Sequence, residues 1–272
     1  MKMKNARSKP KKILLGLVIA ICTGVLVFNA VILIGWLIDR NNIIQETSYT
    51  DDTAQMTDID GGDPFNPSND PDYWYYMGLS LIDVNITELK KINPDTVGFI
   101  SVAGTNINYP VVQTGDNDYY LTHSFKRAYN GAGWVFMDYR NDPNFTDQNT
   151  VIYGHSRFDG TMFSTLKNIL GTSWVNNRDN YVVRYVTESE SMLFRVFAVY
   201  VVPAESYYIQ TGFSGDSSYQ QWLDTMIGRS HYDFGTTINT GDRILTLSTC
   251  QDTNNDNRVV MHAKLIKKMQ RL

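Results

Sequence analysis

The stretch Arg243-Ile-Leu-Thr-Leu-Ser-Thr-Cys250, followed by Arg258-Val-Val-Met-His-Ala-Lys-Leu-Ile266, decides how this chain folds near its C-terminal end. Both segments are apolar and β-branched, and the polar run 251–257 between them is typical of a turn, so they predict two adjacent strands. The loop-side ends of such strands lie together, which places Cys250 beside Arg258. A guanidinium there favours the thiolate and stabilises charge on a carbonyl oxygen. The alternative is a small buried cysteine beside a surface arginine.

The chain offers four candidate histidine partners for this thiol: His123, His155, His231 and His262. His155 ends a short predicted strand that begins at Thr150, and catalytic side chains commonly emerge at strand ends. His262 lies four residues beyond Arg258, roughly 13 Å along a strand, which is too far to share a proton with the thiol. His123 falls in an aromatic segment that favours packing or capping. His231 follows a predicted helix and is expected in a surface loop, so His155 is the preferred partner.

Residues 13–38 form an almost wholly apolar run without a charged side chain. At about 1.5 Å per residue, a helix of this length spans a bilayer with some tilt. Six basic residues and no acidic residue precede it, which predicts a cytoplasmic tail at 1–12 and an extracytoplasmic remainder. A cleaved signal peptide is the alternative, but its apolar region is shorter and ends in a small-x-small site. We therefore expect an uncleaved, single-pass type II anchor in the cell membrane.

The chain after the anchor divides into a predicted flexible linker, 39–70, and one domain, 71–272. The linker is rich in Asp, Gly and Pro and too poor in apolar residues to form a core. Cys250 is the only cysteine of the domain, since the other, Cys22, lies in the anchor. An unpaired thiol outside the cytoplasm is a candidate reactive group. The net charge of −4 argues against a nucleic-acid partner.

The domain reads as mainly β, because many short strand patterns are separated by Gly, Asn and Asp turns, which is typical of a closed barrel or a sandwich. Three helical patterns are predicted at about 71–92, 160–170 and 217–228. The predicted strands are Val97–Val102, Ile107–Val112, Trp134–Asp138, Thr150–Tyr153, Tyr181–Val186, Leu193–Val202, Arg243–Thr249 and Val259–Ile266.

The run Asp252-Thr-Asn-Asn-Asp-Asn257 is superficially like the start of a calcium-binding loop. The sixth position of such a loop needs glycine, and the twelfth needs glutamate. This chain has Asn257 and Ala263 at those positions. The run is therefore expected to be a solvated turn, and neither a metal site nor a cofactor is predicted.

The segments around the thiol and its partners resemble those of the sortases, the membrane-anchored cysteine transpeptidases of Gram-positive cell surfaces. Tyr153-Gly-His155, Thr246-Leu-Ser-Thr-Cys250 and Arg258 carry this resemblance, in the family's order of anchor, histidine, cysteine and arginine. The predicted helix before the cysteine strand resembles a feature of the class B subgroup. Four further segments also resemble class B sequences: Ile92-Asn-Pro-Asp-Thr-Val-Gly-Phe-Ile100, Tyr109-Pro-Val-Val-Gln113, Asp118-Tyr-Tyr-Leu-Thr-His123 and Gly160-Thr-Met-Phe-Ser-Thr-Leu166.

The resemblance implies an eight-stranded β-barrel with added N-terminal helices and a helix before the cysteine strand. It implies that His155, Cys250 and Arg258 form the catalytic set. The activity implied is cleavage of a C-terminal sorting motif after threonine in secreted surface proteins. The acyl group then passes to the amine of a cell-wall peptidoglycan precursor. Ser248 shares the face of Cys250 by strand alternation, so we expect it to bind substrate.

Three other functions compete with wall anchoring. Some class B enzymes polymerise pilins, and this alternative stays open. A hydrolytic cysteine peptidase would use the same chemistry, but papain-like folds place cysteine before histidine, and the caspase signature Gln-Ala-Cys-x-Gly is absent. A membrane-tethered binding module with an incidental cysteine is the non-enzymatic alternative.

Asp63-Pro64-Phe65 is similar to the Asp-Pro-aromatic lid of the pilus-building class C sortases. Those enzymes usually carry a second membrane segment at the C-terminus, whereas this chain ends in Lys267-Lys-Met-Gln-Arg-Leu272. We therefore expect residues 63–65 to belong to the linker rather than to a lid.

The predicted topology can be tested on intact protoplasts. Protease added from outside should remove the domain after residue 38, because that part of the chain is expected to face outward, and immunoblotting of both parts would show it. A mature protein whose first residue lies after position 38 would contradict the uncleaved anchor.

Overall fold

The computed structural model describes residues 9–250 and 257–271, and the chain divides into two compact units, Met1–Asn42 and Ile43–Leu272. Helix α1 (Lys9–Ala54) begins in the first unit and ends in the second. Its residues 13–38 are exposed along almost their whole length. Within the described residues, α1 is the one helix long and apolar enough to cross a membrane. The predicted anchor falls inside this helix.

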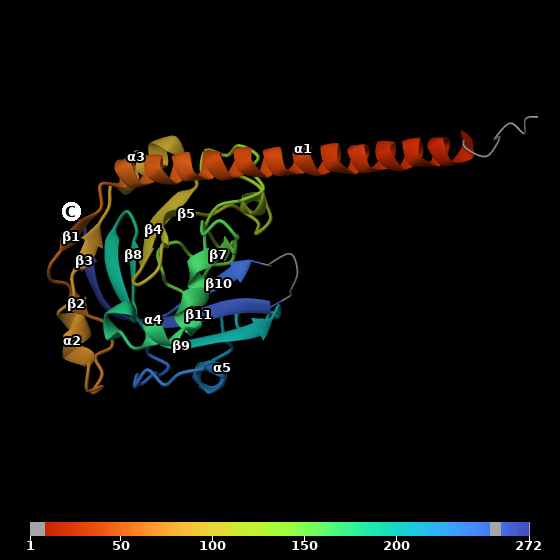
Figure 1. Cartoon of the computed structure of the whole chain (residues 1–272). Coiled ribbons are helices and arrows are strands. Elements are labelled where there is room, and N and C mark those ends of the chain that lie inside the picture. Colours follow the sequence, from red (N-terminus) through yellow and green to blue (C-terminus); the bar gives the residue numbers. More distant parts are fainter. Residues whose placement is uncertain (1–8, 251–256, 272) are drawn as a thin grey trace, which may run out of the picture. The chain divides into compact units, whose positions relative to one another are not determined.

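The second unit is built around a closed barrel of eight strands (Figure 1). Their order around the barrel is β10-β7-β6-β5-β4-β8-β9-β11, and pairing of β10 with β11 closes it. Neighbours are antiparallel except in the pairs β5–β6 and β7–β10. Each predicted strand overlaps one of these strands, so the eight-stranded, mainly β fold is confirmed. The strands are β4 (Thr96–Val102), β5 (Asn108–Val112), β6 (Phe136–Met137), β7 (Asn149–His155), β8 (Val182–Val186), β9 (Glu190–Pro203), β10 (Ile244–Cys250) and β11 (Asn257–Gln270).

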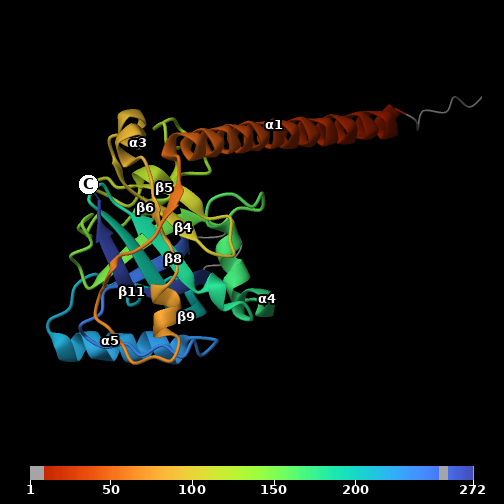
Figure 2. The ribbon, with the colours of Figure 1, turned by 90° about the vertical axis from the view of Figure 1, so that its left-hand side faces the viewer.

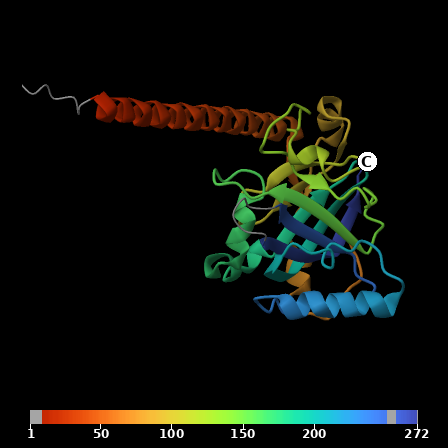
Figure 3. The same ribbon diagram turned by 90° about the vertical axis from the view of Figure 1, so that its right-hand side faces the viewer.

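Strand β10 is covered on both faces. Leu245 and Leu247 pack in the large core cluster, whereas Ile244 packs in a second cluster under helix α5 (Asp216–Arg229). Figures 2 and 3 show α5 running along one side of the barrel. The buried face of α5 has the spacing of an amphipathic helix: Tyr219, Trp222, Leu223 and Met226. The helix predicted at 217–228 is confirmed.

The segment 71–92, predicted as one helix, is interrupted in the structure. Gly78 ends the first short helix, and its N–H bonds to the carbonyl oxygen of Trp74. The Asn85 side chain caps the last helix by accepting from the N–H of Glu88 at 3.2 Å. The residues between them pair as a strand instead. The elements are α2 (Tyr73–Met77), β3 (Leu81–Asp83), which pairs with β1 (Thr57–Ile59), and α3 (Ile86–Ile92).

The helix predicted at about 160–170 is not a regular α-helix. Residues Ser164–Leu170 form a 3₁₀ helix, and the short helix α4 (Thr172–Val175) follows after Gly171. Of the apolar side chains that suggested the helix, Met162, Phe163 and Leu166 are buried, and Leu170 is partly buried.

Residues 39–70 are not a flexible linker from end to end. Helix α1 continues to Ala54, and Ile43 and Ala54 are fully buried in the second unit. The Glu46 carboxylate accepts a hydrogen bond from Ser124 Oγ at 3.0 Å. Hydrogen bonds from polar side chains and backbone pairing between strands attach this stretch to the rest of the second unit. The low apolar content of the sequence did not reveal these two kinds of contact. The folded unit therefore begins at Ile43 rather than at residue 71.

The Asp63-Pro64-Phe65 segment forms an edge strand, β2 (Asp63–Pro64), and not a lid over the end of β10. Pro64 pairs with Lys267 on β11, nine residues from Arg258, which is about 30 Å along a strand. The Phe65 ring packs against the core, 5.5 Å from the Arg243 guanidinium. The run 252–257, expected to be a turn, lies outside the described residues except for Asn257.

His262 makes the stability of the fold depend on pH. It is fully buried on β11, and its ring nitrogens lie 2.7 Å from Tyr200 Oη and 2.7 Å from Thr246 Oγ1. Burial, with a smaller contribution from the Arg229 charge, lowers its pKa from 6.5 to about 3. The folded state thus keeps His262 neutral at a pH where the unfolded chain binds a proton.

The free energy of unfolding should therefore fall as the pH drops below 6.5, by up to about 1.4 kcal/mol per pH unit for this one proton. Replacing His262 with Gln should flatten the slope by about one proton, since Gln does not titrate. Urea unfolding of residues 43–272 between about pH 7 and pH 5 measures this slope. An identical slope in the variant and the parent would contradict the assignment to His262.

Candidate active site

The C-terminal ends of β7 and β10 lie side by side, and their parallel register pairs His155 with Cys250. On the other side of β10, the antiparallel register pairs Ser248 with Val260. Continuing that register by two residues sets Arg258 opposite Cys250. The side chain of Cys250 lies outside the described part of the chain, so its strand gives its place. The structure thus brings the three predicted catalytic positions to one end of the barrel.

A pocket of about 640 Å³ opens at this end of the barrel, a size typical of ligand sites. Its walls come from the loop after β5, from β6 and β7, from the loop after β9, and from the ends of β10 and β11. His155 and Arg258 therefore share the pocket with residues that sequence reasoning did not select. The lining residues are Asn117, Leu121, Phe136, Tyr153, His155, Ala204, Glu205, Ser206, Tyr208, Ile209, Thr249 and Arg258.

The backbone of Leu121 fixes the orientation of the His155 ring. Nε2 lies 2.9 Å from the Leu121 carbonyl oxygen, and a carbonyl only accepts, so Nε2 carries a proton and donates it. In the neutral ring, Nδ1 is then the nitrogen that exchanges protons. Of the two ring nitrogens, Nδ1 is therefore the one available for proton transfer.

The surroundings of His155 favour its neutral form. Burial lowers its pKa most, the bond to the Leu121 carbonyl opposes this shift, and the charges of Arg157 and Arg258 lower the pKa further. The sequence suggested that an imidazolium and Arg258 together favour the thiolate. In the structure, Arg258 is the fixed cation of the pair, while His155 is mostly neutral at neutral pH.

Gly133 allows the loop 119–134 to reach the His155 ring. Its φ is +61°, and a Cβ there would overlap the Tyr120 carbonyl oxygen and lie 2.9 Å from His155 Cδ2. Only glycine fits such a position without displacing the ring or the backbone. The repeated glycines of 130–134 were the sequence signal for this close approach, and that signal was missed.

Ser248 lies beneath the pocket rather than on its surface. It is 1 % exposed, and its Oγ lies 3.0 Å from Tyr208 Oη. Tyr208 lines the pocket and covers the face of β10 that strand alternation assigned to substrate. Ser248 is thus placed to orient Tyr208.

The other histidines lie where their sequence context predicted. His123 stacks on Tyr119 with ring centroids 4.0 Å apart, and its Nδ1 donates to the Tyr119 carbonyl oxygen at 2.8 Å. His231 is exposed, just after α5.

A family model of the sortase domain matches residues 100–266. The chain belongs to the sortase family. Sortase B of Listeria monocytogenes is 37% identical over 186 residues, which cover 67% of this chain and 74% of that protein. Sortase B from Bacillus anthracis in complex with AAEK1 superposes with a TM-score of 0.70 at 32% identity, covering 85% of this chain and 99% of the other. A sortase B complexed with triglycine gives a TM-score of 0.63 at 37% identity, covering 66% of this chain and 85% of the other.

These similarities make this sortase a class B-like cysteine transpeptidase. Of the pocket residues that sequence reasoning missed, Leu121 lay inside a class B-like segment, 118–123, and Asn117 directly before it. Tyr208 and Ile209 carried no signal, because they lie in a loop without periodicity.

Replacing Gly133 with Ala in the sortase should lower kcat at least about tenfold with little change in KM, because a Cβ displaces the His155 ring, which is expected to transfer the proton. Steady-state kinetics measures both constants. Gly115→Ala is the matched control, because a Cβ at Gly115 meets nothing within 4 Å. Equal turnover of the two variants would show that Gly133 does not position His155.

Proposed function

We propose that Cys250 is the nucleophile, His155 transfers the proton and Arg258 stabilises the developing charge. The observation that carries this proposal is the register, which pairs Cys250 with His155 and continues to Arg258. The adjoining pocket supplies space for the peptide. Ser248 enters as a positioning residue, acting through Tyr208.

In the first half-reaction, the Cys250 thiolate attacks the carbonyl carbon of threonine in the sorting motif, and a C–S bond forms. Nδ1 of His155 takes the thiol proton. The carbonyl oxygen becomes an oxyanion, which the Arg258 guanidinium stabilises by charge and hydrogen bonding. The C–N bond then breaks, and Nδ1 gives its proton to the departing amine. A thioester remains on Cys250.

In the second half-reaction, an amine attacks the thioester carbon, a C–N bond forms, and Nδ1 takes a proton from that amine. The C–S bond then breaks, and the leaving thiolate takes the proton from Nδ1, which regenerates the thiol. The sortase B complexed with triglycine supports the amino group of a glycine residue as the acceptor. We propose the amine of a cell-wall peptidoglycan precursor as the natural acceptor.

We propose that the enzyme is a single-pass type II protein of the cell membrane, with the pocket outside. The apolar helix supports the anchor. The six preceding basic residues support the orientation, since such residues stay on the cytoplasmic side.

Transpeptidation predicts that residues 43–272, given peptides with threonine before the scissile bond and triglycine, release mainly the amide conjugate. Mass spectrometry distinguishes this product from the free threonine acid. Cys250→Ala should abolish both products, because the thioester cannot form.

Two results would contradict this proposal. Substantial turnover by Cys250→Ala would remove the nucleophile. Dominance of the acid at saturating triglycine, and with other wall amines, would favour the hydrolytic peptidase.

A further inference from the structure

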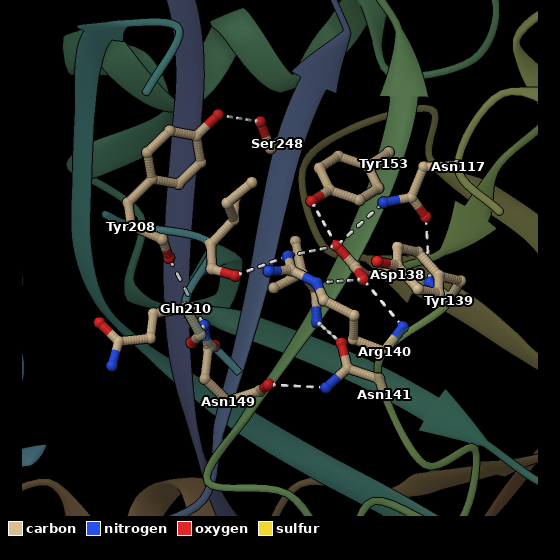
Figure 4. A network of polar contacts seen from close by, with 12 residues as sticks. Asn117, Asp138, Tyr139, Arg140, Asn141, Asn149, Tyr153, Tyr208, Gln210 and Ser248 are labelled. Atoms are coloured by element: carbon tan, nitrogen blue, oxygen red, sulfur yellow. Dashed lines mark hydrogen bonds and ion pairs between the residues drawn. The ribbon is translucent and has the colours of Figure 1, made fainter. Parts of the chain in front are cut away.

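A fully buried carboxylate, Asp138, lies beside the pocket and follows β6 directly. Figure 4 shows it among the side chains that it holds. The Arg140 guanidinium donates to it through Nε at 2.8 Å and through Nη2 at 2.7 Å. Tyr153 Oη donates at 2.8 Å, and Asn117 Nδ2 donates at 3.1 Å. Because these donors satisfy both oxygens, the charge is stable where an isolated one would be costly.

Asp138 is held as a carboxylate. Burial alone would raise its pKa, but the bonds from Arg140 and Tyr153 outweigh burial and lower it. Burial and the Asp138 charge together raise the pKa of Tyr153, so its hydroxyl keeps the proton that it donates. The donor pattern around Asp138 is therefore constant around neutral pH.

The same arginine also holds the loop that forms the far wall of the pocket. Residues 204–215, between β9 and α5, contain no helix or strand. Arg140 Nη2 donates to the Ile209 carbonyl oxygen at 3.0 Å, and Asn149 Nδ2 donates to that of Gln210 at 2.9 Å. These bonds act on the backbone, so they fix the path of the loop irrespective of its side chains.

Three pocket residues from distant parts of the chain thus meet at one carboxylate: Asn117 and Tyr153 directly, and Ile209 through Arg140. We propose that Asp138 is a positioning residue, which sets the spacing between the two walls of the pocket and thereby selects the extended peptide that fits between them. This inference rests on the proposed function of the pocket as the site of the sorting peptide.

A simple structural brace is the competing explanation, and the chain contains a matched control for it. Asp70 is another buried carboxylate, 3.3 Å from Arg195 Nη1 and 3.7 Å from Lys264 Nζ. Neither these partners nor Asp70 lines the pocket. Asn in place of either aspartate removes a buried negative charge and its attraction for its cationic partners, so both variants should lose stability.

The kinetic test uses the full chain in detergent micelles, triglycine, and a library of fluorogenic pentapeptides with threonine fixed before the scissile bond. Asp138→Asn should raise KM for the peptide that the wild type prefers by about tenfold. This is the loss of binding affinity expected when the hydrogen bonds to one charged group are weakened. The value of kcat should stay within about twofold, and the ranking of library peptides should flatten. Asp70→Asn should keep the wild-type KM and ranking despite a lower Tm.

A second measurement does not depend on activity. Amide hydrogen exchange in 204–212 should accelerate in Asp138→Asn and in Arg140→Met, because both release the Ile209 carbonyl, and should stay unchanged in Asp70→Asn. Wild-type protein that converts no library peptide would count against the proposed function, while the exchange data still test the positioning role. If the Asp138→Asn variant kept the wild-type exchange rates and the wild-type KM, the positioning role would be overturned. It would also be overturned by a loss of kcat together with a changed alkylation rate of Cys250, which would show collapse of the catalytic centre.

Discussion

The register of β10 between its two neighbours is the constraint on which the rest of the site depends. Its parallel pairing with β7 places Cys250 beside His155, and its antiparallel pairing with β11 closes the barrel. A slip of one residue would turn every side chain of β10 to the opposite face. Leu245 and Leu247 in one core, and Ile244 under α5, make such a slip costly. The packing of apolar residues therefore holds the alignment of the three proposed catalytic residues.

Within that frame, the two partners of the thiol have different electrostatic roles. Arg258 is a fixed charge, while burial and neighbouring cations keep His155 mostly neutral. A neutral imidazole beside a thiol holds only a small fraction as the ion pair, so the Arg258 charge is the main contribution that favours the thiolate. The bond to the Leu121 carbonyl limits that transfer to one nitrogen. Gly133 is the local condition for this geometry, because any Cβ there would meet the ring.

The sequence predicted what depends on local pattern and on rare residue types. Alternation and turn residues gave the eight strands, and a single cysteine in the domain, followed by an arginine, directed attention to the end of β10. It did not predict contacts between segments far apart in the chain. Strand alternation placed Ser248 on the same face of β10 as Cys250. It did not predict that Tyr208, from the loop after β9, covers Ser248 on this face. The helix expected at 71–92 was interrupted because residues 81–83 found a strand partner at 57–59.

The same limit explains why the boundary of the catalytic unit was placed too far along the chain. Glu46 accepts from Ser124 Oγ at 3.0 Å and from the Lys126 N–H at 3.2 Å, and both donors lie in the loop 119–134 that orients His155. That loop is thus bonded to the helix from the anchor and to the catalytic ring through Leu121. Polar contacts of this kind leave no periodic signal, so a composition rich in Asp and Gly was interpreted as a linker. A domain cut at residue 71 would lack one of the two supports of this loop, whereas the compact unit that begins at Ile43 keeps both.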